Sequence, residues 1–237
     1  MMPFYKKVLL KLSGESLGGK NKSGIDVDVL RYFASQIAAA VQNKTQIAIV
    51  IGGGNILRGL SSQAAEMDRV NADKMGMLAT VINSLALADA VRNAGLDARV
   101  LTAFPIGTIG ELYTKDTAMQ YLNEGKVVIV AGGTGNPFFT TDTAAVLRAI
   151  EINADVILKG TRVDGVYDDD PEKNPQAKKF ESISYKEVID KNLRVMDITA
   201  ISMAMDNKLP IVVFDLGNKD NLIKIISGEK IGTIVGT

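Results

Sequence analysis

The stretch Gly132-Gly-Thr-Gly-Asn-Pro-Phe-Phe-Thr-Thr-Asp142 decides the predicted fold, because it joins a buried strand to a helix. The apolar run of residues 127–131 precedes it, and an apolar-periodic helix begins near Asp142. Glycines, an Asn-Pro turn and two threonines allow backbone N–H groups and hydroxyls to converge just ahead of the helix N-terminus. We expect either a site for an anionic, oxygen-rich ligand or an ordinary strand-to-helix connection. In the second case Thr140 or Thr141 caps the helix and Asp142 favours its dipole.

Length and composition favour a folded α/β protein that acts on small molecules. The 237 residues are 46% hydrophobic, and no polar or Pro-rich linker divides them, so we expect a single domain over residues 1–237. The 27 basic and 27 acidic side chains give zero net charge. This balance gives no support to binding of nucleic acid or of an anionic membrane.

The chain contains neither cysteine nor histidine. Disulfides, thiolate zinc sites, Ser-His-Asp chemistry and imidazole bases are therefore excluded. Phosphoryl transfer fits the remaining side chains well, because it depends mostly on positioning and on cationic stabilisation around Mg²⁺. We expect a cytoplasmic protein, since the first residues form no targeting peptide and no apolar run approaches the roughly 20 residues of a membrane span.

Lys11 lies near the carboxyl end of a predicted first strand, Lys7–Leu12. It is either a solvated strand-end lysine or a contact to a phosphate. The next residues, Gly14-Glu-Ser-Leu-Gly-Gly19-Lys20-Asn21, nearly match the P-loop pattern, but Asn21 lacks the hydroxyl that would hold Mg²⁺. We reject a P-loop and expect a flexible loop after Leu12.

A second buried strand, Gln46–Ile51, runs into Gly52-Gly-Gly-Asn55, with Arg58 close behind. Successive glycines allow backbone amides to approach a phosphate closely, and a guanidinium can bind two phosphate oxygens at once. The alternative is a tight turn. The dinucleotide fingerprint G-x-G-x-x-G is absent, because Leu57 occupies the position of the third glycine.

Strands and helices alternate along the chain, which predicts a three-layer α/β/α sandwich with a mostly parallel central sheet. The expected strands are residues 7–12, 46–51, 98–102, 126–131, 155–159 and 210–214, with an edge strand at 233–235. The expected helices are residues 25–41, 73–94, 115–123, 142–153, 197–207 and 221–227, with Asp73 as a cap or first-turn acid of the second and Gly95 just beyond its end. Residues 180–191 should form a turn and a short helix. The loops after Leu12, Ile51, Ala131 and Lys159 should lie at one edge of the sheet, where ligands of such folds bind.

Five motifs in this order resemble the amino-acid kinase superfamily, and within it the bacterial UMP kinases very closely. They are Lys11-Leu-Ser-Gly-Glu15, Ile51-Gly-Gly-Gly-Asn55 with Arg58, Asp73-Lys-Met-Gly-Met-Leu-Ala-Thr80, Gly133-Thr-Gly-Asn-Pro-Phe-Phe-Thr-Thr-Asp142, and Val163-Asp-Gly-Val-Tyr167 with Asp170-Pro171. The Gly-Asn-Pro-Phe-Phe-Thr-Thr-Asp run separates UMP kinases from the acetylglutamate, aspartate and carbamate kinases of the same fold.

The resemblance implies transfer of the ATP γ-phosphoryl group to UMP, making UDP in pyrimidine nucleotide biosynthesis with Mg²⁺ as cofactor. The residues implied to contact ATP are Lys11, Leu12, Ser13, Gly14, Gly54, Arg58, Thr161, Tyr167 and Asp170. Those implied to contact UMP are Gly53, Asp73, Thr134, Gly135, Asn136, Pro137, Phe138, Phe139, Thr140 and Thr141.

The implied catalytic residues are Lys11, Arg58, Asp142 and, by its location, Lys159. No general base is needed, because the attacking phosphate oxygen is already ionised at neutral pH. Asp142 would hold a lysine or the metal in place, and no residue is assigned as a metal ligand. On this hypothesis Asp142→Asn slows the reaction by orders of magnitude and leaves the melting temperature nearly unchanged.

The resemblance also implies a homohexamer that is activated by GTP and inhibited by UTP. The loop matching the GTP contacts is Gly19, Lys20, Asn21, Lys22, Ser23 and Gly24. Ala88 and Arg92 stand where the best-known enterobacterial pattern has an arginine and a histidine, which leaves the size of GTP activation open.

Three other functions compete with this interpretation. One is a kinase of the same fold with another acceptor, and a second is a catalytically silent sensor of uridine or guanine nucleotides. The third, a dinucleotide-dependent oxidoreductase, is disfavoured by the missing fingerprint.

Overall fold

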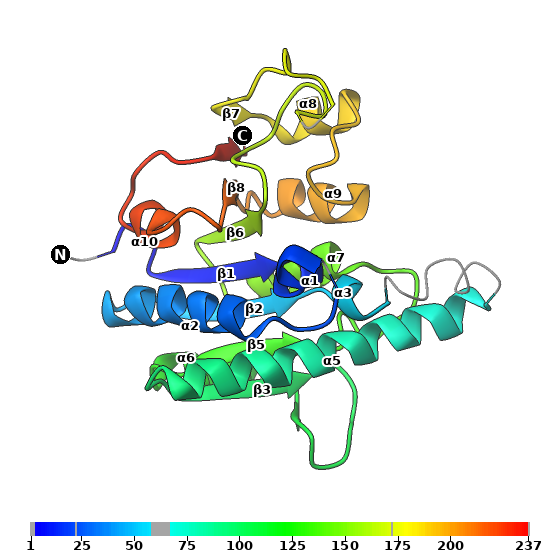
Figure 1. Cartoon of the computed structure of the whole chain (residues 1–237), viewed down its shortest axis with the longest axis vertical. Helices are drawn as coiled ribbons and strands as arrows, with labels where there is room; N and C mark the ends of the chain where they lie inside the picture. The colour runs from blue at the N-terminus through cyan, green and yellow to red at the C-terminus, as the bar shows by residue number, and fades with distance from the viewer. Residues whose placement is uncertain (1–2, 22, 58–66, 172, 237) are drawn as a thin grey trace.

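The computed structural model describes residues 3–21, 23–57, 67–171 and 173–236, which form a layered α/β structure around one sheet (Figure 1). In the described residues the sheet has nine strands in the order β4-β3-β5-β2-β1-β6-β8-β9-β7. Their bounds are β1 Lys7–Leu12, β2 Gln46–Ile51, β3 Ala98–Thr102, β4 Glu111–Leu112, β5 Val127–Ala131, β6 Val156–Thr161, β7 Ser182–Ile183, β8 Ile211–Asp215 and β9 Thr233–Val235. All neighbours pair in parallel except β8 and β9, so the predicted mostly parallel sheet is confirmed.

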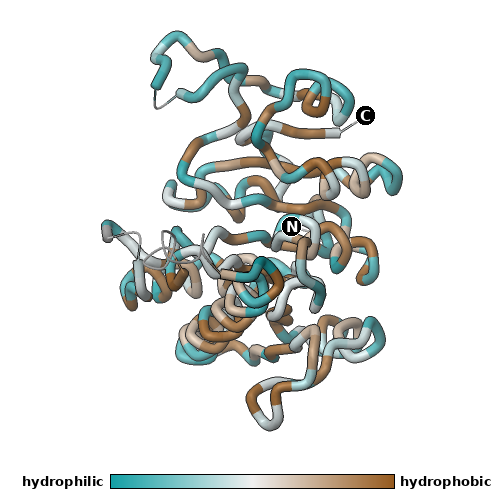
Figure 2. Tube along the Cα trace, turned by 90° about the vertical axis from the view of Figure 1, so that its right-hand side faces the viewer, coloured by the Kyte–Doolittle hydropathy of each residue, from teal (hydrophilic) through white to brown (hydrophobic). Residues whose placement is uncertain are grey.

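The central strands are buried on both faces, which explains their continuous apolar sequences. Along β1, Leu10 packs into one hydrophobic cluster and its neighbour Leu9 into another on the opposite face. Hydrophobic positions accordingly follow the strands through the middle of the molecule, whereas the loop at the top of Figure 2 is mostly hydrophilic.

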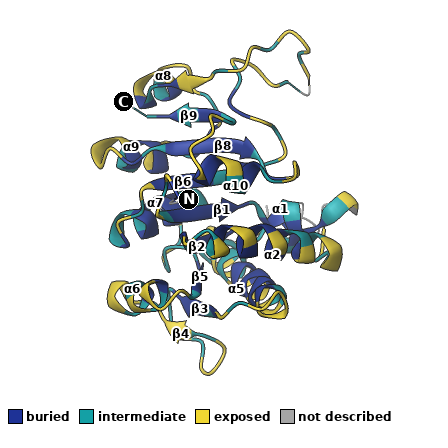
Figure 3. Ribbon diagram, turned by 90° about the vertical axis from the view of Figure 1, so that its left-hand side faces the viewer, coloured by how far each residue is buried: buried dark blue, intermediate teal, exposed yellow. Residues whose placement is uncertain are grey.

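Helices cover both faces of the sheet, as Figure 3 shows. One face carries α2 (Val27–Gln42), α5 (Arg69–Asn93) and α10 (Asn221–Ile226). The other carries α6 (Lys115–Asn123), α7 (Thr141–Glu151), α8 (Tyr185–Asp190) and α9 (Ile198–Asp206). The three-layer arrangement therefore follows the prediction.

The structure corrects the start of the long helix α5. It begins at Arg69, four residues before Asp73, because the Asp68 side chain caps it by accepting a hydrogen bond from the Asn71 N–H at 3.1 Å. The predicted end is right, since Gly95 follows the last turn with a left-handed φ of 87°. By length and composition alone α5 could cross a membrane, but its inner face is buried against α2 and the sheet.

Five short elements were not predicted, among them the two-residue strand β4. A one-turn helix, α1 (Gly14–Leu17), and a 3₁₀ turn, η1 (Gly19–Asn21), replace the flexible loop expected after Leu12, and α3 (Gly54–Leu57) follows β2. The strand β9 was expected at the sheet edge, but the two residues of β7 pair beyond it. Because α1 and α3 follow the adjacent strands β1 and β2, they lie in contact with each other.

Gly14 lies so close to the second glycine turn that a side chain cannot fit. A Cβ added there would lie 2.4 Å from the Gly52 carbonyl oxygen and 2.7 Å from the Gly54 nitrogen. We expect Gly14→Ala to lower the free energy of unfolding by about 1–3 kcal/mol, the usual cost of overpacking. Urea denaturation measures it. Gly217→Ala is the control, because its Cβ would meet only the Oδ1 of the Asp215 side chain, at 3.1 Å, and no backbone atom. Equal stability of the two variants would contradict the expectation.

Candidate active site

The carboxyl ends of four adjacent parallel strands, β6, β1, β2 and β5, meet at one edge of the sheet. The predicted convergence of the loops after Leu12, Ile51 and Ala131 is therefore confirmed. The fourth strand, β6, continues to Thr161, so the loop expected directly after Lys159 begins two residues later.

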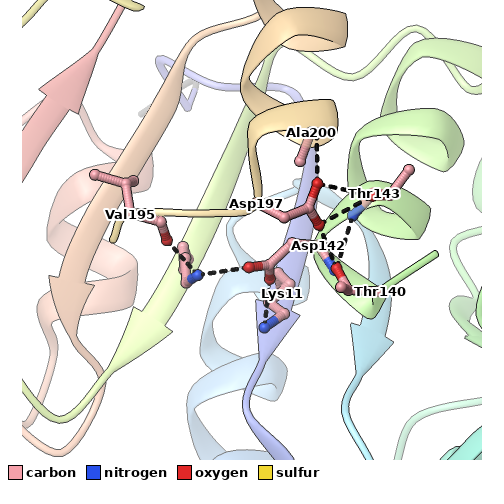
Figure 4. Close-up of polar contacts among 8 residues, drawn as sticks. Lys11, Thr140, Asp142, Thr143, Val195, Asp197 and Ala200 are labelled. Atoms are coloured by element: carbon pink, nitrogen blue, oxygen red, sulfur yellow. Dashed lines mark hydrogen bonds and ion pairs between the residues drawn. The ribbon is translucent and has the colours of Figure 1, made fainter. Parts of the chain in front are cut away.

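Two lysines and one carboxylate form the centre of this edge (Figure 4). Lys11 and Lys159 are register partners on β1 and β6, so their side chains leave the sheet side by side on the face covered by α7. The Asp142 carboxylate lies between them, with Oδ1 2.6 Å from the Lys11 Nζ and Oδ2 3.0 Å from the Lys159 Nζ. Lys159 also donates a hydrogen bond to the Val195 carbonyl.

Burial makes these charges depend on one another. The side chains of Lys11, Lys159 and Asp142 are only 10%, 14% and 16% exposed. Burial alone would raise the pKa of Asp142, but the two neighbouring ammonium groups outweigh it, so the pKa lies below its usual value. For Lys159, burial and the neighbouring Lys11 lower the pKa more than Asp142 raises it. With both lysines protonated, the cluster carries one net positive charge in a site from which water is largely excluded.

The N-terminus of α7 fixes the position of Asp142. Thr140 is the N-cap, as one of the two predicted alternatives, and its hydroxyl accepts hydrogen bonds from the N–H groups of Asp142 and Thr143 at 3.0 and 3.4 Å. The Thr140 and Thr143 hydroxyls both donate to the Asp197 carboxylate, which also caps α9 through the Ala200 N–H at 2.8 Å (Figure 4). Asp197 therefore ties two helix N-termini together beside the lysines.

A cavity of about 210 Å³ opens on the β2 and β5 side of this cluster; we call it the acceptor-side cavity. Its lining is Gly53, Gly54, Leu57, Ala72, Asp73, Gly76, Met77, Thr80, Gly133, Asn136, Phe139, Thr140 and Thr141. Six residues implied to contact UMP are among them. Thr134, Gly135, Pro137 and Phe138 are not, and the Phe138 side chain is 65% exposed.

Asp73 joins α5 to the loop that follows β5. Its Oδ2 accepts a hydrogen bond from the Phe138 N–H at 2.7 Å, and both oxygens accept from the Arg69 Nε at 3.0 and 2.9 Å. Burial opposes ionisation of Asp73, but these hydrogen bonds and the charge of Arg69 lower its pKa overall. Asp73 is thus an ionised hydrogen-bond acceptor in the wall of the acceptor-side cavity rather than a helix cap.

A second cavity, of about 590 Å³, lies on the β6 side and is called the donor-side cavity. Lys159, Thr161, Tyr167 and Asp170 line it, together with residues of the segment from 191 to 195. Among the other residues implied to contact ATP, Lys11, Leu12, Ser13 and Gly14 line neither cavity, and Gly54 lies on the acceptor side. Arg58 and Lys22 lie outside the described residues.

The described part of the chain offers no group of three or more acidic side chains that could hold a metal ion. Asp142, the carboxylate best placed for one, is already paired with two lysines. The residues therefore do not fit a resident metal site, and a divalent cation would have to be held mainly by a polyphosphate substrate.

The profile of the Amino acid kinase family matches residues 6–215. The chain belongs to the amino acid kinase family. A uridylate kinase from Bacteroides thetaiotaomicron is 58% identical over 234 residues, which cover 99% of each chain. Among solved structures, a UMP kinase from Bacillus anthracis superposes with a TM-score of 0.94 at 39% identity, covering 98% of this chain and 96% of that one. A UMP kinase from Ureaplasma parvum gives 0.91 at 35% identity, covering 98% and 99%.

These similarities confirm the predicted resemblance to the amino acid kinase family and, within it, to the UMP kinases. The roles of the individual residues remain predictions.

Asp142→Asn tests the charge balance of the cluster. The variant leaves two buried ammonium groups without a counter-charge, so we expect the free energy of unfolding at pH 7 to fall by about 3–5 kcal/mol. This replaces the expectation of an unchanged melting temperature, because the sequence did not show that both lysines are buried.

The loss should depend on pH in a defined direction. Burial and the neighbouring Lys11 already lower the pKa of Lys159, and without Asp142 this pKa falls further below the unfolded value of about 10.4. At pH values between the folded-state and unfolded-state pKa, the folded variant binds fewer protons than the unfolded chain. Its free energy of unfolding should therefore rise with pH over this range. Urea denaturation at pH 7 and pH 9.5 measures this. The control, Asp97→Asn at a surface pair with Arg99, should cost at most about 1 kcal/mol. A similar loss in both variants would contradict the role of Asp142 as the counter-charge of the two buried lysines.

Proposed function

We propose that this chain transfers the γ-phosphoryl group of ATP to the 5′-phosphate of UMP, giving UDP and ADP in pyrimidine nucleotide biosynthesis. The observation that carries the proposal is the Lys11–Asp142–Lys159 cluster, which adjoins the linings of both cavities. Lys159 lines the donor-side cavity, and Thr141, the neighbour of Asp142, lines the acceptor-side cavity. The uridylate kinase relatives, similar over nearly the whole chain, support the choice of acceptor.

The chemistry requires positioning and positive charge rather than a base. An ionised oxygen of UMP attacks the γ-phosphorus, and the bond from that phosphorus to the β–γ bridging oxygen breaks with its electrons leaving on ADP. The protein must overcome the repulsion between two polyanions. Lys11 and Lys159 supply cations held in place by Asp142, and such pre-oriented charge acts most strongly on the spread charge of the transition state.

Mg²⁺ enters this proposal as part of the nucleotide substrate. When bound to the phosphates of ATP it neutralises part of their negative charge. The lysine cluster would face the transferred group from the protein side.

The proposal extends to assembly, regulation and location. Leu78, Ile82 and Leu85 of α5 are 49%, 49% and 39% exposed at helical spacing, which suits burial against a second copy in a homohexamer. GTP as activator and UTP as inhibitor are proposed from the family resemblance, and the nucleotide substrates suit a cytoplasmic enzyme. Ala88 is fully buried, and Arg92 donates a hydrogen bond to the Ala98 carbonyl at 2.7 Å.

The competing functions are less well supported. A silent sensor would have no need of two buried lysines oriented by one carboxylate, and membership of the amino acid kinase family argues against an oxidoreductase. A different phosphate acceptor is the alternative that the next experiment addresses.

A panel of nucleoside monophosphates tests the acceptor. We expect kcat/KM for UMP to exceed that for CMP and AMP by on the order of 10²-fold or more, because sites that hydrogen-bond a base discriminate steeply. A coupled assay of ADP release with each monophosphate measures this ratio. Comparable turnover of CMP would overturn the assignment of the acceptor.

Lys11→Ala tests the transition-state role of the cluster. We expect kcat to fall by at least ~10²-fold, the scale seen when one charge partner of a transition state is lost. The control is Lys126→Ala, which removes a lysine paired with Glu124 just before β5, at the opposite edge of the sheet. An unchanged kcat with only a raised KM for ATP would show that Lys11 serves ground-state binding alone.

A further inference from the structure

Two asparagines, Asn55 in α3 and Asn83 in α5, pair side chain to side chain inside the protein. Asn55 is 2% exposed and Asn83 is fully buried. The Asn83 Nδ2 donates to the Asn55 Oδ1 at 2.7 Å, and the Asn55 Nδ2 donates to the Asn83 Oδ1 at 3.0 Å. Neither residue belongs to the catalytic cluster, yet each places a polar group where an unsatisfied one would be costly.

The second hydrogen of each amide reaches a backbone carbonyl. Asn83 donates to the Gly52 oxygen and Asn55 to the Gly24 oxygen, both at 2.7 Å. Carbonyl oxygens only accept, so the nitrogen of each amide must face them, which settles both side-chain orientations. All four amide hydrogens therefore have acceptors, and the network is closed.

The first carbonyl belongs to the glycine turn beside the proposed acceptor site. The Gly52 N–H donates to the Leu12 carbonyl at 3.0 Å, and a Cβ on Gly53 would lie 2.9 Å from the Gly76 oxygen in α5. The turn is thus held between the end of β1 and α5. Gly53 and Gly54 line the acceptor-side cavity, and their N–H groups donate to no other described residue.

The second carbonyl belongs to the segment that leads into α2. Asn55 holds Gly24 twice, because its side chain donates to the Gly24 carbonyl and its own carbonyl accepts from the Gly24 N–H at 3.0 Å. Two segments more than twenty residues apart are therefore joined through one amide pair.

We propose that Asn83 and Asn55 are positioning residues that hold the Gly52–Gly54 turn with its free N–H groups toward the phosphates of the bound substrates. The Gly52 carbonyl accepts from the buried Asn83 side chain, and the Gly53 carbonyl accepts from the N–H groups of Ile56 and Leu57, so both oxygens are already occupied inside the protein. The same pair joins the turn to the Gly24 segment through hydrogen bonds, so a displacement of either segment would displace the other. This role rests on the proposed phosphoryl transfer.

Asn83→Leu tests the proposal, because leucine has the same number and branching of side-chain heavy atoms but no hydrogen-bonding group. The matched control is Ser84→Ala, since Ser84 is equally buried on the same helix and donates only to the Thr80 carbonyl at 2.7 Å. We expect kcat/KM for UMP to fall about 10- to 100-fold in Asn83→Leu, the scale of a small misplacement of binding groups. Ser84→Ala should stay within about twofold of the wild type. Equal losses in the two variants would overturn the proposal.

Amide hydrogen exchange provides a readout that does not depend on activity. In Asn83→Leu we expect exchange at residues 23–26 and at 53–57 to accelerate about tenfold or more, with neither segment changed in Ser84→Ala. Unchanged exchange at 53–57 would overturn the positioning role. If Asn83→Leu does not fold, Asn83→Ser takes its place with the same criteria.

The two proposals fail in different ways. A wild-type chain that forms no UDP would overturn the proposed function, while the exchange measurement would still support or overturn the amide pair as the support of the turn. Normal wild-type activity with an unaffected Asn83→Leu would overturn the positioning role alone.

Discussion

The site depends on balancing the positive charges of two lysines that are register partners on adjacent parallel strands. Lys11 and Lys159 leave β1 and β6 on the same face, so two cations share a buried space that is unfavourable without an anion. Asp142 supplies that anion from the first turn of α7, and Thr140, Thr143 and Asp197 fix the helix end that carries it. The connection after β5 must therefore bring α7 back across the lysines, which links sheet order, helix placement and site geometry.

Much of the fold could be predicted because its main elements have strong periodicity. The bounds of β3 and α6 match the prediction to the residue, since both are delimited by turn or capping residues. The elements missed, α1, η1, α3, β4 and β7, span two to four residues and are too short to show any period. The start of α5 was misplaced because Asp68 and Asp73 are both suitable caps, and only tertiary contacts give Asp73 another partner.

The site residues that belong to motifs at strand ends could be predicted from the sequence. Those whose hydrogen-bond partners are distant in the sequence could not. Lys11 and Asp142 stand in such motifs, and parallel topology brought them together as expected. Asn83 and Thr143 looked like ordinary polar residues in helices, because their partners are 31 and 54 residues away. Asp197 was recognised only as a cap, since its second role exists only once α7 and α9 pack together.

The two outermost strands carry a consequence for how this chain can associate. The edges β4 and β7 contain two residues each, so the sheet offers hardly any unpaired ladder to a neighbouring chain. Short edges of this kind protect a mostly parallel sheet, whose central strands are long and apolar, from adding strands of another molecule. Another chain therefore has almost no strand to pair with at either edge of the sheet. Copies of this chain should instead associate through their helices, and such contacts form closed assemblies more readily than an open sheet does.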